Sequence, residues 1–326
     1  MQHLILLTAA LLTSDMPKAE LAGPVQKIWD KAPHNAFTDL IRFQERWYCV
    51  FREGDGHAKG PGAIRVLTSA DGSAWQSAAL LQWPGIDLRD PHISRTPNGE
   101  LMIIGGAAEP ATRDPLTDHY SFVSFSKDGR AWSKPQRVGP SWHWLWRVTW
   151  HGDKAYTVGY HWDPKTKDKD GATLFRSADG VKFDALAQFK IPRPTEATLV
   201  FDGDKLLCLQ RRDGKPNTAM LGTSDPPYTD WKWMDLGVYF GGPNFLRTPD
   251  GNWWAAGRII DKGKAQTMLC HLDVQAGKLT PALTLPSGGD TSYPGMVWQD
   301  GLLWVSYYSS HEGKTSIYLA KVKTSR

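Results

Sequence analysis

The sequence has few cysteines, no basic run and no hydrophobic run long enough to cross a bilayer. Its three cysteines lack the CxxC or CxxH spacing of a metal site, and an odd number cannot form a complete set of disulfides. Lysine and arginine (38) barely exceed aspartate and glutamate (34), and the net charge of +4 does not by itself argue for nucleic acid. We therefore expect buried free thiols, no metal site, no cofactor, no nucleic-acid partner and no membrane span.

The one apolar run near the start covers residues 4–12, which is too short to span a membrane. Its position is typical of a secretory signal, so we interpret residues 1–15 as a signal peptide and expect a secreted or periplasmic protein. No lysine or arginine precedes the run, and initiation at Met16 is the alternative.

No stretch shows helical periodicity, whereas aromatic and turn-forming residues are abundant. The 326 residues include 16 tryptophans, 31 glycines and 22 prolines, a composition that favours an all-β protein with many turns. Such aromatic-rich surfaces serve either sugar binding or core packing.

Hairpin-turn signals recur along the chain at a nearly constant interval. They lie at residues 44–46, 97–99, 151–153, 202–204, 249–251 and 300–301. Successive glycines from Gly99 to Gly301 are separated by 53, 51, 48 and 50 residues. A period this regular predicts a repeat architecture rather than two unrelated domains.

Each repeat of roughly fifty residues has room for four short strands, which is the content of one β-propeller blade. Six turns predict a six-bladed β-propeller of four-stranded antiparallel blades, forming a single domain over residues 24–326. The last repeat supplies only three strands. We therefore expect the segment 25–29 to return as its fourth strand and close the ring.

A second feature repeats between the third and fourth strands of the early blades. Its copies are Ser69–Trp75, Ser126–Trp132 and Ser177–Phe183, each reading Ser-x-Asp-Gly-x-x-aromatic. The aspartate suits the turn amides, and glycine suits a positive φ. This motif resembles the Asp-box, or BNR repeat, of the sialidase (neuraminidase) superfamily, which implies a sialidase-like propeller.

The first strand of each blade in a propeller lines the axis, and here those strands open with polar residues. They are Asp39, Asp90 with His92, Arg147, Glu196, Asn244 and Tyr293, and the ends of the second strands add Arg52, His161, Arg211, Arg212, Arg258 and Tyr308. Ionisable groups that converge inside a β core indicate an active site or, alternatively, a structural ion-pair network.

The resemblance to sialidases extends to some of these residues. The stretch from Glu196 to Arg211 and Arg212 is similar to the sialidase blade that carries a glutamate and, one hairpin later, a substrate-binding arginine. The stretch Thr291–Val297 resembles the strand of their tyrosine nucleophile. The resemblance implies that Tyr293 attacks and Glu196 is its base, because a neutral phenol tolerates a substrate carboxylate better than a carboxylate nucleophile does.

The acid/base and the arginine clamp match less closely. Asp55 lies in a loop that resembles the one carrying the sialidase aspartate, and Asp39 and Asp90 are its rivals. Sialidases use three arginines on the substrate carboxylate, and the position of the first reads Ala36–Asp39 here. The expected substrate-binding residues are Arg211, Arg212, Arg258, Arg147, Arg52, His92, Asn244 and Tyr308.

The resemblance thus implies an exo-acting, sialidase-like glycoside hydrolase that acts on a terminal acidic sugar of a glycan, and we expect a monomer. Two alternatives stay open. One is a lyase for uronate-containing polysaccharides, in which tyrosine or histidine removes the proton beside a neutralised carboxylate. The other is a non-catalytic carbohydrate-binding propeller, which a wide separation of Glu196 and Tyr293 would favour.

Overall fold

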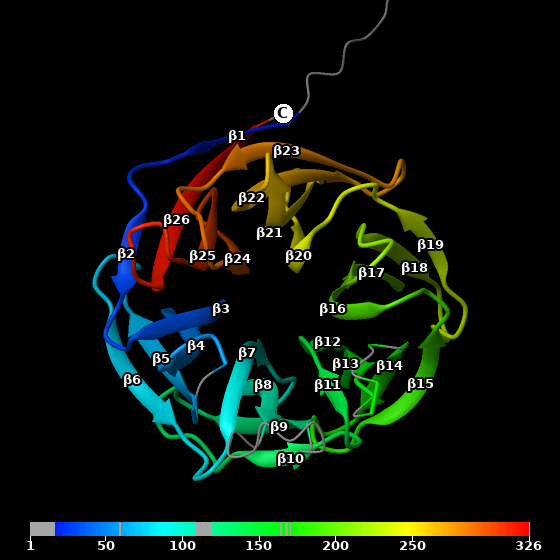
Figure 1. Ribbon diagram of the computed structural model, residues 1–326, viewed down its shortest axis with the longest axis horizontal. Helices are drawn as coiled ribbons and strands as arrows, with labels where there is room; N and C mark the ends of the chain where they lie inside the picture. Colours follow the sequence, from blue (N-terminus) through cyan, green and yellow to red (C-terminus); the bar gives the residue numbers. More distant parts are fainter. Residues whose placement is uncertain are drawn as a thin grey trace, which may run out of the picture.

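The computed structural model describes residues 17–325 except 59, 109–118, 164, 167, 168 and 170. The predicted signal segment lies outside these residues. All regular elements in the described part are β-strands, arranged as six sheets around a common centre (Figure 1). No helix long and apolar enough to cross a membrane is found in this part of the chain.

The six sheets are the blades of an antiparallel propeller, as the repeat predicts. Blade one contains β3 (His34–Phe43), β4 (Arg46–Gly54), β5 (Ala63–Ser69) and β6 (Gln76–Leu81). Blade two contains β7 (Asp87–Arg95), β8 (Leu101–Ala108), β9 (His119–Ser126) and β10 (Gln136–Val138). Blade three contains β11 (His143–Leu145), β12 (Thr149–His151), β13 (Lys154–His161), β14 (Gly171–Ser177) and β15 (Asp184–Phe189). Blades four and five contain β16 (Pro194–Asp202), β17 (Lys205–Arg212), β18 (Met220–Ser224) and β19 (Lys232–Asp235); and β20 (Gly241–Arg247), β21 (Trp253–Asp261), β22 (Lys264–Asp273) and β23 (Lys278–Thr284).

Blade six joins the two ends of the chain, which confirms the predicted closure. Its strands β24 (Thr291–Gln299), β25 (Leu302–Ser309) and β26 (Ser316–Ser325) are completed by β2 (Gln26–Trp29), which pairs with β26. A further strand that the sequence did not indicate, β1 (Lys18–Leu21), pairs with the last residues of β26. Two N-terminal strands therefore cover the outer edge of this blade.

The hydrophobic core consists of six clusters of described residues, each packed between two neighbouring blades. Alternation along β4 shows the reason: Trp47 and Cys49 belong to the cluster shared with blade six, whereas Tyr48 and Val50 belong to the cluster shared with blade two. Both faces of the middle of the strand are buried, so residues 47–51 are all apolar. The three cysteines are free and buried, as expected.

The Ser-x-Asp-Gly segments form tight turns that pack on the preceding blade. In the turn of blade two, the Ser126 hydroxyl accepts from the amide of Gly129 at 2.8 Å, and Asp128 Oδ1 accepts from the amide of Arg130 at 2.8 Å. The ring of Tyr48 in blade one lies against Gly129, and its hydroxyl donates to the Asp128 carbonyl at 2.9 Å. These turns thus fasten neighbouring blades together.

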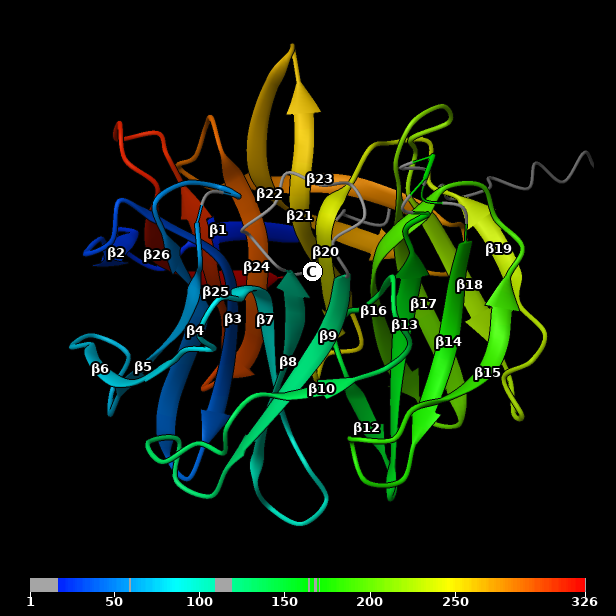
Figure 2. The same cartoon turned by 60° about the horizontal axis from the view of Figure 1, so that its bottom comes forward.

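One hairpin extends beyond the other blades (Figure 2). It is formed by β21 and β22, whose facing residues include Arg258 and Thr267. Arg258 pairs with Gly241, the first residue of β20. The residues of β21 that follow Arg258 therefore extend beyond the start of β20, at the end of the ring where the innermost strands begin. The hairpin therefore rises beside the candidate site described next.

Candidate functional site

Five of the six innermost strands contain a β-bulge at the same level. The register shifts occur in β3 (36–39), β7 (89–92), β16 (194–197), β20 (241–244) and β24 (292–295). Phe37, Asp90, Gly242 and Tyr293 have φ between 45° and 64° at these bulges. A bulge redirects the side chain that it carries, so the repeated irregularity brings one residue of each such blade toward the axis.

Tyr293 and Glu196 meet at this level from blades six and four. The Tyr293 hydroxyl donates to Glu196 Oε1, which also accepts from Arg211 Nη1. The other carboxylate oxygen accepts from the amide of Gly242 at 2.7 Å. Glu196 is only 5% exposed, and each oxygen of this buried carboxylate has a hydrogen-bond partner. Residues of three blades therefore hold the carboxylate in place.

The protonation states of the pair are set by burial and by the neighbouring arginines. Burial alone would raise the pKa of Glu196, but the charge and hydrogen bond of Arg211 and the hydrogen bond of Tyr293 outweigh it and lower that pKa to about 2. Burial and the negative charge of Glu196 raise the pKa of Tyr293 well above its usual value. At neutral pH the resting pair is therefore a carboxylate beside a neutral phenol.

Two arginines flank the pair. Arg211 contacts Glu196 and donates from Nε to Asp213 at 2.9 Å. Arg258, on β21, donates to the Thr291 carbonyl at 2.7 Å and to the Tyr308 hydroxyl at 3.2 Å. The carbon at the centre of its guanidinium group lies 5.8 Å from the centroid of the Tyr293 ring. The site therefore holds two cationic groups of a type that suits a carboxylate ligand.

Asp90 carries a carboxyl group at the blade-two bulge. Burial, followed by the negative charge of Glu196, raises its pKa to about 7, although Arg89, His57 and Arg52 act in the opposite direction. Asp90 also raises the pKa of Tyr293 through its charge, which places it in the same electrostatic environment. A carboxyl group that titrates near neutrality has the property required of a general acid.

The other two predicted acids are placed differently. Asp39 accepts from Arg147 Nη1 and from the amide of Ile93 at 2.9 Å, and its pKa is lowered because Arg147 and His92 overcome the effect of burial. For Asp39, a structural ion pair of the kind that the sequence left open as an alternative is therefore present. Asp55 is exposed in the loop after β4.

The remaining predicted substrate-binding residues make contacts within the propeller. Arg52 is fully buried and donates to Asp87 Oδ1 at 2.8 Å. Arg212 faces the side of β17 opposite to Arg211 and donates to Asp235 at 2.6 Å. Asn244 donates to the Pro294 carbonyl at 2.9 Å. The ring of His92 lies 4.7 Å from that of Trp146, centroid to centroid and tilted by 57°, and the Tyr308 hydroxyl links Arg258 to Asp290.

The bulge of blade one presents an aromatic residue instead of the first arginine that sialidases use. The Phe37 ring centroid lies 5.2 Å from that of Tyr293 and 5.4 Å from that of Tyr308. This position is consistent with the sequence Ala36–Asp39, in which no arginine occurs. Any clamp for an anion must therefore be built from arginines of other blades.

Sequence reasoning did not single out the bulges, although a signal for three of them is present. Asp90, Gly242 and Tyr293 each precede a proline at the corresponding position of their blades. Proline removes a ladder donor and is tolerated in a strand mainly at edges and bulges. The repeated X-Pro pair therefore marks the level at which the strands are interrupted.

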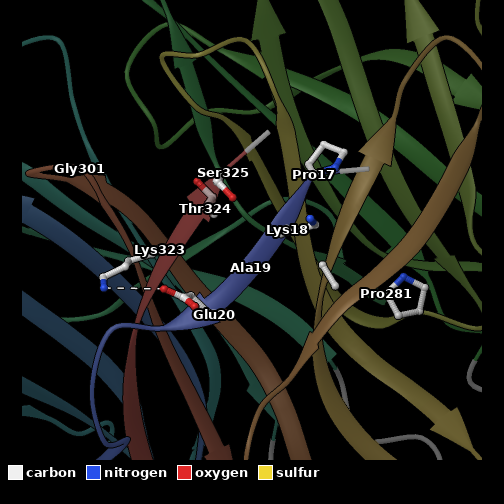
Figure 3. Close-up of a pocket in the computed structure, with 10 residues that line it drawn as sticks. Pro17, Lys18, Ala19, Glu20, Pro281, Gly301, Lys323, Thr324 and Ser325 are labelled. Atoms are coloured by element: carbon white, nitrogen blue, oxygen red, sulfur yellow. Dashed lines mark ion pairs between the residues drawn. The ribbon is translucent and has the colours of Figure 1, made fainter. Parts of the chain in front are cut away.

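A surface hollow lies far from this chemistry, where β1 runs between β26 and β23 (Figure 3). Its lining includes Pro17, Lys18, Pro281 and Ser325, and an exposed ion pair joins Lys323 to Glu20 at 3.7 Å. An exposed pair of this kind is worth little energy, and no buried acid or nucleophile accompanies it. We therefore place the candidate site at the centre of the ring.

Comparisons with known proteins agree with the fold. No protein-family model matches the sequence, and no curated protein matches it. A protein of unknown function from Dyadobacter fermentans has a TM-score of 0.83 at 16% identity, with 94% of this chain and 100% of that chain covered.

Two solved glycoside hydrolases are also similar in structure. A Trypanosoma rangeli sialidase in complex with sialic acid has a TM-score of 0.71 at 12% identity, with 93% of this chain and 58% of that chain covered. A mutant α-L-arabinofuranosidase from Fusarium graminearum, in complex with an iminosugar inhibitor, has a TM-score of 0.71 at 13% identity, with 92% and 97% covered. The present chain therefore has the six-bladed propeller fold of the sialidases, which the arabinofuranosidase shares.

Proposed function

We propose that the protein is an exo-acting, sialidase-like glycoside hydrolase that releases a terminal acidic sugar from a glycan. The observation that carries the proposal is the hydrogen bond from the Tyr293 hydroxyl to Glu196, with Arg211 on the same carboxylate oxygen. Glu196 and Tyr293 are not widely separated, as the alternative of a non-catalytic propeller would have favoured. The similarity to solved sialidases and an arabinofuranosidase supports the same reaction class.

In the proposed first step, the Tyr293 oxygen attacks the anomeric carbon while its proton passes to Glu196. The glycosidic carbon–oxygen bond breaks, and Asp90 donates a proton to the leaving oxygen. In the second step, Asp90 removes a proton from water, the water oxygen replaces Tyr293 on the anomeric carbon, and Glu196 returns the proton to the phenolate. Both carboxyl groups regain their initial states, so the cycle is balanced.

The low pKa of Glu196 makes it a weak base in the resting site, and an anionic substrate changes this. A substrate carboxylate held by Arg211 and Arg258 would offset the positive charge that stabilises ionised Glu196. The pKa of Glu196 would then rise as the substrate binds, and the carboxylate would become a better acceptor for the Tyr293 proton. This coupling favours an acidic sugar over a neutral one.

We assign the general acid to Asp90 rather than Asp55 on electrostatic grounds. The pKa of about 7 for Asp90 leaves much of this group protonated at neutral pH. The charge of Glu196 acts on Asp90, and that of Asp90 acts on Tyr293, whereas Asp55 is an exposed loop residue. A protonated acid and an ionised base are the pairing that retaining chemistry needs.

The proposal is tested by a screen of purified protein against aryl glycosides and acidic oligosaccharides, with reducing sugar and ultraviolet absorbance measured on the same samples. Removal of the nucleophile in Tyr293→Phe should lower kcat by about a hundredfold or more. Tyr307→Phe is the matched control, because Tyr307 lies on the same blade and its hydroxyl donates to the Pro286 carbonyl, away from Tyr293 and Glu196.

Each result of the screen has a defined meaning. Sugar release by the wild type and by Tyr307→Phe, but not by Tyr293→Phe, supports the hydrolase. An unsaturated, ultraviolet-absorbing product replaces it with the lyase. Glycan binding without any product, in the wild type as in Tyr293→Phe, overturns both and leaves the carbohydrate-binding propeller.

A further inference from the structure

Two histidines and an aspartate that the catalytic proposal does not use lie together next to the central site. His34 begins β3, His57 lies in the loop after β4, and Asp290 directly precedes β24. They are far apart in the sequence, so their spacing showed no metal-binding pattern. The closure of blade six on blade one brings them together, with the ring of Phe37 centred 5.0 Å from that of His57.

The donor atoms of the three side chains face one another. Asp290 Oδ2 lies 2.9 Å from His34 Nε2 and 2.8 Å from His57 Nδ1. One ligand atom from each residue lies within 4.8 Å of the other two. Two ligands of one ion, each about 2.0–2.1 Å from it, are about 2.9–3.3 Å apart at octahedral or tetrahedral angles. Both contacts to Asp290 are close to this spacing.

The polar contacts of His34 also suit a metal ligand. His34 is 7% exposed, and among the described residues Asp290 is its only side-chain hydrogen-bond partner, because Nδ1 has none. Nε2, the nitrogen that faces Asp290, is the one a metal ion would bind, so an ion would take the place of the proton that His34 and Asp290 share and would keep both side chains in contact with one partner.

Asp290 is held in place before any ion binds. Its amide donates to the Ser310 hydroxyl at 2.9 Å, and its carbonyl accepts from the Ser310 amide at 3.0 Å. Its second carboxylate oxygen accepts from the Tyr308 hydroxyl at 2.9 Å. Outer partners of this kind orient a ligating carboxylate.

We propose that His34, His57 and Asp290 bind a divalent transition-metal ion such as Zn²⁺. Imidazole and carboxylate ligands suit Zn²⁺ and other divalent first-row transition metals, and three protein ligands leave a coordination position for water or an anion. The ion would fasten the His57 loop to blades one and six. It would also add positive charge beside Phe37, where blade one presents no arginine.

The test uses tag-free, chelator-treated full-length protein titrated with ZnCl₂ by calorimetry and with CoCl₂ by visible absorption spectroscopy. We expect one ion per chain with a dissociation constant tighter than about 10 µM, together with cobalt d–d bands that Zn²⁺ abolishes. His57→Ala should weaken binding at least about tenfold. Because the His57 side chain is 56% exposed, this variant should fold normally.

Two further variants separate this site from histidines elsewhere. Asp290→Asn keeps the shape of the side chain and removes its charge, so it should also weaken binding, whereas His311→Ala should bind as the wild type does. His311 lies in the loop after β25, and its ring contacts Ser309 instead of the cluster. The proposal is overturned if the wild type does not bind either ion, or if His57→Ala and Asp290→Asn bind as tightly as His311→Ala. Because the readout is binding, a failure of the glycosidase assignment leaves this result intact.

Discussion

Asp90 is the carboxyl group of the central site whose pKa, at about 7, lies closest to neutral pH. Its carboxyl group is forced toward the neutral form by burial and by the charge of Glu196, which itself stays ionised because of Arg211. Two carboxyl groups in one site thus have opposite protonation states, with pKa values of about 7 and about 2. Such a division separates the roles of acid and base.

The raised pKa of Asp90 predicts a pH dependence of activity. Because the group must be protonated to act as the acid, kcat/KM should fall as the pH rises through about 7. Asp90→Asn should greatly lower the activity and remove this alkaline limb. Asp55→Asn is the control, and loss of the limb in that variant alone would transfer the acid role to Asp55.

The same pKa shift predicts an effect on stability. The native state retains the Asp90 proton up to about pH 7, whereas the unfolded chain loses it near about pH 4. The stabilising contribution is therefore complete below the unfolded pKa and is lost as the pH rises through the folded one. Asp90→Asn should gain Tm relative to the wild type between about pH 4 and pH 8, and a constant difference over this range would contradict the assignment.

At the level of single elements, two repeated irregularities organise the propeller. The bulges direct side chains toward the axis, and the Ser-x-Asp-Gly turns pack one blade on the one before it. The turn of blade one illustrates the packing, because Gly72 lies against the stacked pair Trp47 and Trp304, whose ring centroids are 4.2 Å apart. The bulges thus position side chains at the candidate site, and the turns stabilise the contacts between neighbouring blades.

Gly129 in the blade-two turn gives a stability prediction for this packing. A Cβ atom there would lie 2.2 Å from Cε1 of Tyr48, and the backbone has φ of 71°. Gly99 has φ of 81° and no atom within 4 Å of a Cβ, so Gly99→Ala isolates the backbone strain. Urea denaturation should show that Gly129→Ala loses about 1–3 kcal/mol more than Gly99→Ala. Equal losses would mean that the turn does not fasten the blades.

At the level of the whole molecule, the ring depends on the N-terminal strands. β1 and β2 pair along different parts of β26, and Trp29 Nε1 donates to Glu53 of blade one at 2.6 Å. The N-terminal segment therefore joins blade six to blade one and covers a sheet edge. A propeller without this closure exposes an unpaired edge.

Truncation tests the contribution of each closing strand. A chain that starts at Val25 loses β1, and one that starts at Ala32 loses both strands. We expect Tm to fall in that order relative to a chain that starts at Pro17, with aggregation in the shortest form because the edge of β26 is exposed. Thermal unfolding and light scattering measure both effects, and identical Tm values for all three chains would show that closure is not needed.

The sequence by itself determined the period, the blade number, the strand that closes the ring and the turns between strands. These properties depend on residues that are close in sequence, because glycine turns and apolar alternation act over a few positions. The sequence also predicted that Glu196, Arg211, Arg258 and Tyr293 lie near the axis, since each occupies a defined place in its repeat, and the structure places them side by side.

Only the tertiary structure decided which of these polar residues lie together. Asp39, Asp90 and Asp55 look alike in sequence, but a salt bridge to Arg147, burial near Glu196 and exposure in a loop give them different surroundings. His34 and Asp290 are separated by most of the chain and meet only through ring closure. Pairings and electric fields between blades depend on distances in space, which a local pattern does not contain.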